Sequence, residues 1–254
     1  MNWLTRKTGW AVSLTLGALT LAAPLAAQTQ GNGYLFREPI GSFNLRGGFA
    51  HAMAGSDVFS FSKQQFTLGS WSFSGPMAAA DLGIHLSDRV QIVGGVGVSG
   101  SEATTQYRDL VENNEGEDEI RQTHTLMRVP LTASLKAYLS PPGRSVGSFA
   151  WVPARYAPYV GAGGGGLWYR FEQEGDFVNS ETFVIRTDRL ESTGWTKTAH
   201  AFAGVDLSLS PRFGVTTEAR YDWGQATLDA ASYEGFEPID LSGLSASVGL
   251  HIRI

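Results

Sequence analysis

Residues 127–139 read MRVPLTASLKAYL, and every odd position in this stretch is apolar. The even positions include Arg128, Thr132, Ser134 and Lys136. A period of two is typical of a strand whose two faces meet different surroundings, whereas a helix repeats about every 3.6 residues. The stretch therefore predicts a β-strand with one apolar face and one polar face.

Seven more segments alternate in the same way, and no segment has a convincing amphipathic helical pattern. They span residues 43–49, 78–86, 90–98, 156–171, 199–209, 213–223 and 244–254. Strands in soluble proteins average about 5–6 residues, whereas a tilted strand needs about 9–11 residues to cross a membrane. Most of these segments have nine to sixteen residues, which favours strands that cross a membrane.

The connections between these segments differ in length. Two connections are tight polar turns, residues 87–89 and 210–212. Four others are long: 53–75, 109–119, 174–193 and 227–238. Short turns at one rim and long loops at the other are typical of outer-membrane barrels. The connection 140–155 breaks the pattern, and a plug, a short helix and a turn all remain open for it. We predict an all-β, eight-stranded antiparallel up-and-down transmembrane β-barrel.

The N-terminus has the pattern of a secretion signal. Arg6 and Lys7 precede an apolar stretch, residues 10–21, and small residues lead to Ala27, after which we expect cleavage. An uncleaved anchor is the alternative, although the apolar run is shorter than the roughly 20 residues that span a bilayer. The expected organisation is a signal peptide over 1–27, an N-terminal periplasmic segment over 28–41 and the barrel over 42–254.

Odd or even position along each strand, here called parity, also assigns the charged residues to one face of the barrel wall. With the apolar set facing outward, four cations and four anions face inward: Arg46, Asp81, Arg128, Lys136, Asp206, Glu218, Arg220 and Asp222. An eight-stranded barrel is just wide enough for its side chains to fill, so these charges would form a closed, ion-paired interior. In a soluble lipocalin-like barrel the same eight residues would face water instead, and parity alone does not separate the two readings.

Composition excludes several classes of protein. The 254 residues contain no cysteine, so there is no disulfide, thiolate metal site or cysteine nucleophile. The net charge of −5 provides no overall basic surface for nucleic acid. Charged residues make up only 17%, and there are 31 glycines. Residues 161–166 formally match G-x-G-x-x-G, but no helix follows, so we interpret these glycines as room for large neighbours inside the barrel.

Two segments resemble a known family. Residues 158–163, followed by more glycine, and residues 129–139 are similar to the small outer-membrane β-barrel domain family, the OmpA/OmpX-type, porin-like barrels of Gram-negative bacteria. The resemblance implies an outer-membrane location, contact with lipid and insertion by the barrel-assembly machinery. Gly249, Ile252 and Ile254 resemble its C-terminal assembly signal, although the family usually ends in an aromatic residue.

Candidate chemistry is sparse. Five histidines are present, but we find no matching serine–histidine motif, and His200 and Asp206 are about 20 Å apart along one strand. The acidic stretch 109–119 is interpreted as a solvated, mobile loop; calcium binding is the alternative, although the spacing matches no EF-hand loop. The aromatic first loop, which includes Phe59 and Trp71, is interpreted as strand extension above the membrane or rim packing in preference to a partner-binding surface. We expect no catalytic residues, no metal site and no cofactor.

The function that these features favour is structural, adhesive or surface interaction. We expect a monomer whose outer loops contact an unidentified partner, with no nucleic acid among its ligands. A narrow passive channel is the first alternative, and a soluble periplasmic ligand-binding barrel is the second.

Overall fold

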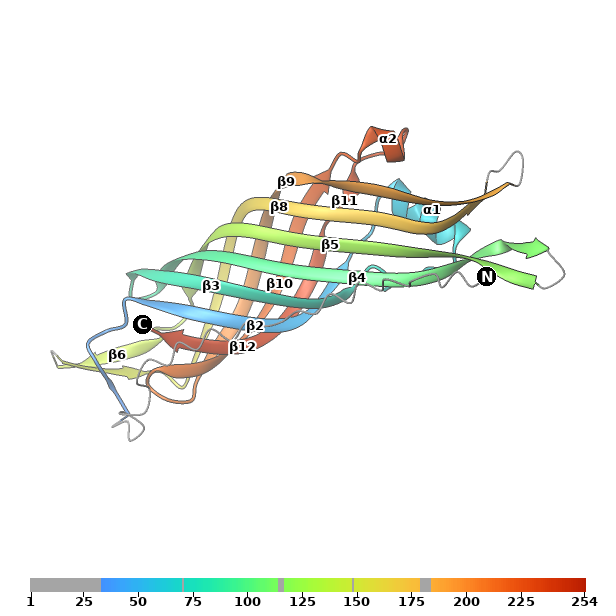
Figure 1. Ribbon diagram of the computed structural model, residues 1–254. Helices are drawn as coiled ribbons and strands as arrows, with labels where there is room; N and C mark the ends of the chain where they lie inside the picture. The colour runs from blue at the N-terminus through green and yellow to red at the C-terminus, as the bar shows by residue number, and fades with distance from the viewer. Residues whose placement is uncertain (1–32, 70, 114–116, 148, 179–183) are drawn as a thin grey trace, which may run out of the picture. The chain divides into compact units, whose positions relative to one another are not determined.

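Eight strands form a closed ring in the computed structural model, which describes residues 33–69, 71–113, 117–147, 149–178 and 184–254 (Figure 1). They are β2 (Gly41–Ala52), β3 (Gly75–Ser87), β4 (Val90–Asn113), β5 (Glu117–Tyr138), β8 (Tyr156–Val178), β9 (Ile185–Ser208), β10 (Phe213–Ala226) and β12 (Gly243–Arg253). Each pairs antiparallel with the next, and β12 pairs with β2. The predicted fold class is confirmed; the signal-peptide prediction lies outside the described residues.

Three short strands form a separate sheet at one end of the ring. They are β1 (Leu35–Phe36), β6 (Gly143–Val146) and β7 (Ala150–Pro153), paired in the order β1-β7-β6. The connection 140–155, which the sequence left open, supplies two of these strands. The third comes from the segment before the barrel, because Leu35 pairs with Trp151.

The two ends of the ring differ. The short-turn end carries the β3–β4 and β9–β10 turns and the small sheet. The long-loop end carries α1 (Asp57–Gln65), α2 (Ala230–Tyr233) and β11 (Ile239–Asp240) in its connections. A helix was not expected in the first loop, so α1 corrects that expectation. Figure 1 shows the β4–β5 and β8–β9 hairpins reaching far beyond the ring at the long-loop end.

These hairpins include much of the sequence that was predicted to form the loops 109–119 and 174–193. Pairing between β8 and β9 continues out to Val178 and Ile185, and pairing between β4 and β5 reaches Asn113 and Glu117. Cross-strand pairs support the extension: Glu174 lies opposite Arg189, and the Thr104 and Thr123 hydroxyls are 3.2 Å apart. The acidic stretch 109–119 thus lies mostly on strand backbone, and its side chains lie outside the described part of the structure.

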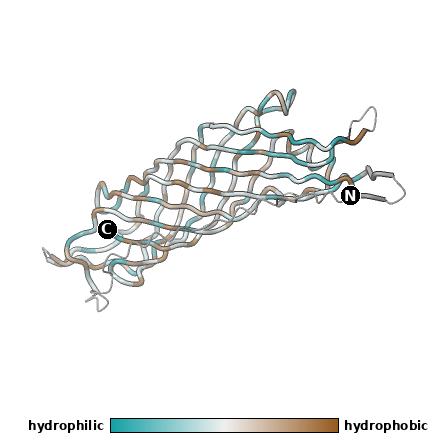
Figure 2. Tube along the Cα trace, in the orientation of Figure 1, coloured by the Kyte–Doolittle hydropathy of each residue, from teal (hydrophilic) through white to brown (hydrophobic). Residues whose placement is uncertain are grey.

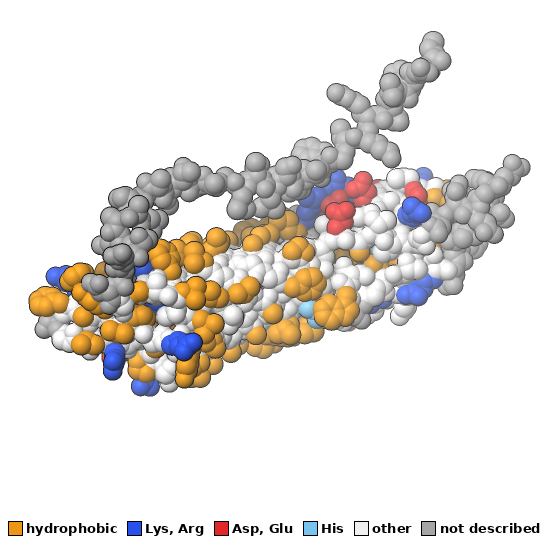
Figure 3. Space-filling model, turned by 90° about the horizontal axis from the view of Figure 1, so that it is seen from below, with side chains coloured by type: hydrophobic (Ala, Val, Ile, Leu, Met, Phe, Trp, Pro, Cys, Tyr) orange, Lys and Arg blue, Asp and Glu red, His pale blue; other side chains and the backbone are white. Residues whose placement is uncertain are grey.

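The outer surface of the ring is apolar. Hydropathy alternates along every barrel strand (Figure 2), and hydrophobic side chains spread along the outside with charged ones toward the ends (Figure 3). The exposed large side chains include Leu45, Leu82, Ile92, Val96, Leu131, Leu135, Val160, Trp195, Leu207, Trp223, Val248 and Leu250, which we call the apolar belt. No helix among the described residues is long and apolar enough to span a membrane.

Glycine lets the interior pack closely at β8. A Cβ atom added to Gly161 would overlap the ring of Phe202, and one added to Gly163 would overlap the backbone of Ala133 and Ser134. These inward glycines therefore admit a bulky neighbour and a close strand.

Candidate functional site

Arg46 is the centre of the first ion-pair cluster inside the ring. Its Nε and Nη2 atoms donate to Asp81 Oδ2 at 3.0 and 2.6 Å, and its Nη1 pairs with Glu218. These residues come from β2, β3 and β10, and all three side chains are at most 9% exposed. One guanidinium thus pairs with two buried carboxylates, which leaves this cluster with a formal charge of 1 − 2 = −1.

Asp206 organises a second cluster nearer the short-turn end. Its Oδ2 accepts hydrogen bonds at 2.8 Å from both Lys136 Nζ and Tyr138 Oη. Lys136 Nζ also lies 3.6 Å from the centre of the Tyr159 ring. A buried ammonium that has both a carboxylate and an aromatic face is well compensated for its lost hydration.

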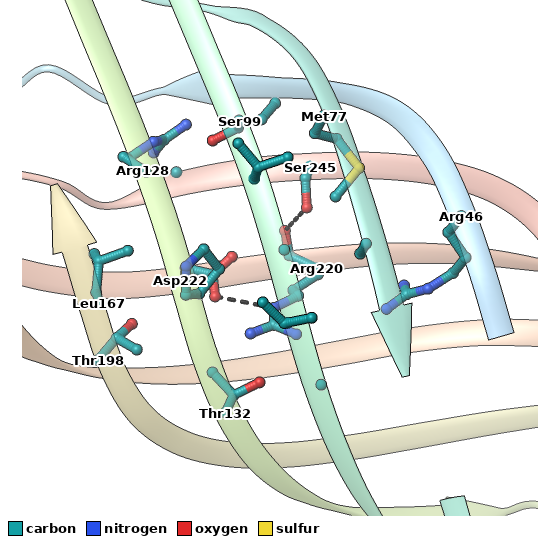
Figure 4. Close-up of a pocket in the computed structure, with 18 of the residues that line it drawn as sticks. Arg46, Met77, Ser99, Arg128, Thr132, Leu167, Thr198, Arg220, Asp222 and Ser245 are labelled. Atoms are coloured by element: carbon teal, nitrogen blue, oxygen red, sulfur yellow. Dashed lines mark hydrogen bonds and ion pairs between the residues drawn. The ribbon is translucent and has the colours of Figure 1, made fainter. Parts of the chain in front are cut away.

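The remaining three interior charges line a cavity of about 60 Å³ (Figure 4). Arg220 Nε donates to Asp222 Oδ1 at 2.9 Å, along the same strand. Arg128 Nη1 instead donates to the Leu241 carbonyl at 3.1 Å, and among the described residues no carboxylate lies within ion-pair distance of it. A space of this size accommodates a few waters, which polar side chains on its wall would bind. The structure thus places all eight expected charges inside the ring, in three groups.

Sequence reasoning missed the interior histidine pairs. Ser134 Oγ lies 2.6 Å from His200 Nε2, and Asn44 Oδ1 lies 2.7 Å from His251 Nδ1. Alternation put each of these residues on the inner face, but nothing in the sequence gave their register. His200 Nδ1 is buried without a partner among the described residues, so the Ser134–His200 pair lacks the third group that orients a catalytic base.

No metal centre emerges from the same residues. Within the described ranges, no group of three histidine or acidic residues is arranged to hold an ion. The His200 and Asp206 side chains, expected to be too distant to pair, contact Ser134 and Lys136 instead.

An apolar core fills the other half of the interior, toward the long-loop end. Helix α1 supplies Val58 and Phe59, which are 1% and 0% exposed. The Phe59 ring packs edge-on against Phe73 and Phe171, at centroid distances of 4.6 and 5.5 Å. We call this group the apolar plug; its members include Ala52, Ala54, Val58, Phe59, Phe66, Leu68, Phe73, Leu126, Leu167, Tyr169, Phe171, Ala226, Leu228, Tyr233, Ile239 and Leu241. The first loop therefore packs into the rim as a helix and does not extend a strand, although Trp71 remains 66% exposed.

His124 lies beneath α1, beyond the apolar belt. Gln173 Nε2 contacts both Ser62 Oγ at 3.1 Å and His124 Nδ1 at 3.2 Å. The Phe66 and Phe73 rings lie edge-on to the imidazole, at centroid distances of 5.0 and 6.3 Å. Burial lowers the pKa of His124 to about 4, because the charged form would lose its hydration among these rings.

The assembly-signal residues lie on the strand that closes the ring. Gly249 faces inward against the backbone of Leu45 and Arg46 on β2. Ile252 lies on the outer face, as does Ile254, which is 61% exposed just past the end of β12. They therefore share the seam between the first and last barrel strands.

Comparisons with known proteins return structures but no sequence relatives. No family model matches the chain, and no curated protein matches it. The crystal structure of the outer membrane protein OprG from Pseudomonas aeruginosa is 12% identical, covering 87% of this chain and 99% of that one, with a TM-score of 0.43. Neisserial surface protein A is 13% identical, covering 84% and 99%, with a TM-score of 0.42. Ail, the attachment invasion locus protein of Yersinia pestis, is 13% identical, covering 84% and 99%, with a TM-score of 0.41.

Strand topology and surface chemistry place the chain in a structural class. Eight antiparallel strands close on themselves, the outside of the ring is apolar, and the inside holds paired charges. This is the arrangement that a bilayer imposes on a barrel, because every backbone polar group must be paired within the ring. The chain therefore has the fold of the small outer-membrane β-barrel proteins.

Proposed function

We propose that this chain is an integral outer-membrane barrel that does not conduct and that acts through its long-loop end at the cell surface. The single observation that carries this proposal is that the ring is filled at two levels. The apolar plug occupies the long-loop half, and the Arg46 and Asp206 clusters occupy the other half. Solute passage would require both layers to open.

The apolar belt supports the membrane location. Its side chains are large and exposed, as with Leu131 at 58% and Val248 at 55%. Leaving such groups in water costs about 25 cal/mol per Å² of apolar surface, whereas lipid accepts them. A soluble ligand-binding barrel would reverse this arrangement, with an apolar lumen and a polar exterior.

The two extended hairpins support the surface role. On β8, ten residues separate Trp168 at the upper part of the belt from Val178 at the strand end, which is roughly 33 Å along the strand. The outward side chains there are polar, and they include the linked ion pairs of Arg170 and Arg189 with Glu172 and Glu191. A rigid polar wall of this height is a contact surface outside the membrane. Its orientation toward the cell exterior follows the usual placement of long loops.

Planar-bilayer recording tests the closed interior. The intact protein should give no single-channel steps, because neither layer leaves a continuous water path. A variant that lacks residues 56–74 should also stay closed, because the Arg46 and Asp206 clusters still fill the other half of the ring. Steady conductance by the intact protein would overturn the closed-lumen proposal and favour the passive channel.

Shortened hairpins test the surface role. We would delete residues 105–122 and 175–188, joining positions that already face each other across each hairpin: Thr104 with Thr123, and Glu174 with Arg189. The variant keeps Gln173 and His124 and should still insert. Cells that carry it should lose adhesion to plastic and cell-to-cell sedimentation relative to the intact protein. Unchanged adhesion with normal insertion would contradict a surface-contact role.

The closing strand supports insertion by the barrel-assembly machinery. Ile252 and Ile254 lie on the lipid side of β12, where a docking partner can reach them before the ring closes. The interior pairs give no support for catalysis, since Ser134 and His200 are both buried and contact each other within the filled lumen.

A further inference from the structure

Five arginines surround the short-turn end without a side-chain partner. Arg89 and Arg212 lie in the β3–β4 and β9–β10 turns, Arg155 precedes β8, and Arg37 and Arg144 belong to the small sheet region. All five are exposed, and none makes a side-chain hydrogen bond or ion pair among the residues that the structure describes. Figure 3 shows basic side chains at that end of the molecule, and others at the opposite end beside acidic ones. We call these five residues the arginine ring.

Elsewhere the arginines are engaged. Arg46 and Arg220 hold carboxylates, Arg128 holds a carbonyl, and Arg253 donates to Ser208 Oγ and two backbone carbonyls. Arg186, far out on β9, is exposed and has no such partner either. Unsatisfied guanidinium groups are therefore concentrated where the ring meets the short turns.

Charge at this end is unbalanced. Two exposed carboxylates, Glu38 and Asp88, accompany the five arginines, which leaves a side-chain charge of 5 − 2 = +3. The long-loop end has the opposite tendency; its exposed acids include Glu102, Glu174, Asp188, Asp229, Glu234 and Glu237. The ring thus has one basic end.

Apolar side chains accompany the arginines. Phe36 beside Arg37 is 79% exposed, Tyr156 beside Arg155 is 65% exposed, and Leu209 near Arg212 is 74% exposed. Leu86, near Arg89, is 61% exposed. This alternation of apolar and cationic groups matches the boundary between acyl chains and headgroups, where arginine reaches outward from an apolar surface.

We propose that the arginine ring binds the phosphate groups of anionic phospholipids in the leaflet that faces the short-turn end. This inference rests on the membrane location proposed above. A guanidinium donates two parallel hydrogen bonds to a phosphate, which an ammonium does not. The arginine ring selects lipids with a net negative charge because Glu38 and Asp88 neutralise only two of its five positive charges. A zwitterionic headgroup carries its own cation, which offsets its phosphate charge.

Boundary-lipid spectroscopy tests the proposal. The protein would be reconstituted in phosphatidylcholine bilayers that contain either spin-labelled phosphatidylglycerol or spin-labelled phosphatidylcholine. Both leaflets carry the probe, so the direction of insertion does not affect the result. The intact protein should associate with phosphatidylglycerol about threefold more strongly than with phosphatidylcholine, and salt should reduce the ratio.

Substitutions locate the effect. A variant with Arg37→Gln, Arg89→Gln, Arg144→Gln, Arg155→Gln and Arg212→Gln should bring the ratio close to one. The single change Arg212→Gln should lower it partly, whereas Arg186→Gln should leave it unchanged. The last variant is the matched control, since it removes one exposed, unpaired arginine that lies beyond the bilayer.

The failures are distinguishable. A chain that does not insert into neutral phosphatidylcholine, read by protease protection, would contradict the proposed membrane location and this inference with it. An inserted chain with equal association of both probes, or an unchanged ratio in the five-glutamine variant, would overturn only the lipid site. Co-sedimentation with purified peptidoglycan that the arginines alone support, without lipid preference, would assign them to the cell wall instead.

Discussion

Gln173 on β8 donates its side-chain amide to the Ser62 hydroxyl on α1 at 3.1 Å, across 111 residues of sequence. Both side chains are buried, and the Ser62 hydroxyl also donates to the Val58 carbonyl at 2.8 Å. Lys63 anchors the same helix by donating to the Ala54 carbonyl at 2.9 Å. These hydrogen bonds fix the first loop to the inside of the barrel wall. The apolar plug is therefore an ordered part of the fold.

Phe59→Ala should loosen the apolar plug. The ring is fully buried against Phe73 and Phe171, so its loss leaves a cavity that costs about 3–5 kcal/mol. Limited proteolysis should then cut the first loop faster, while the eight-stranded ring still resists heat on unheated gels. Phe61→Ala is the control, because Phe61 is 49% exposed. Equal cleavage of both variants would show that the plug does not depend on this ring.

Acid should also loosen the plug through His124. Its pKa is lowered to about 4 in the seated loop and returns to the ordinary value near 6.5 when the loop opens. Between these values only the open form binds a proton, so the stability of the seated form falls as the pH drops from about 6.5 to 4, by roughly 3 kcal/mol in total. The protection factors of residues 53–74, which compare the exchange rate with its intrinsic value at each pH, should fall accordingly.

The variant His124→Gln removes this titration. Its loop protection factors should be nearly independent of pH over the same range, since the groups that contact His124 are Gln173, Phe66 and Phe73, none of which ionises there. The same acid response in the variant and in the intact protein would assign it to another group.

Arg46→Met should destabilise the barrel itself. The change leaves the buried carboxylates of Asp81 and Glu218 without a cation, which lowers the free energy of unfolding by about 3–5 kcal/mol. Urea unfolding in lipid vesicles would measure the loss, with Arg186→Met as the control at an exposed, unpaired arginine. Adding Asp81→Asn and Glu218→Gln should recover much of the stability because no lone charge remains. A single variant as stable as the intact protein would refute the structural role of the cluster.

Period-two alternation was sufficient to predict the ring. Each of the eight predicted segments corresponds to one barrel strand, and parity places Arg46 and Asp206 on one shared face of the wall. That this face is the inner one does not follow from parity, because a soluble barrel would have the reverse orientation. Partner choice does not follow, because it depends on register between distant strands. Ser134 meets His200 across 66 residues, and Arg128 reaches the Leu241 carbonyl across 113.

Helix α1 was hidden for a different reason. Its sequence, DVFSFSKQQ, alternates apolar and polar residues from Phe59 to Ser62, a local pattern that is typical of a strand. Nine residues are too few to be stable as an isolated helix, and the helix forms because the barrel mouth buries Val58 and Phe59. The arrangement of the loop is thus decided by tertiary packing that no local pattern contains.

Gly163→Ala should impair assembly because this glycine faces inward where β8 approaches β5. A Cβ atom there would overlap the Ala133 carbonyl oxygen and the Ser134 Cα, and backbone atoms cannot move aside as a flexible side chain can. Overpacking of this kind costs about 1–3 kcal/mol, which should lower the urea midpoint in vesicles. Gly94→Ala is the matched control, since it also lies within a barrel strand but has open space around the added Cβ. Because alanine restricts the unfolded chain, Gly94→Ala should match or slightly exceed the stability of the intact protein. Equal loss in both variants would attribute the effect to strand glycines in general, whereas loss in Gly163→Ala alone identifies close strand approach as the reason for glycine in β8.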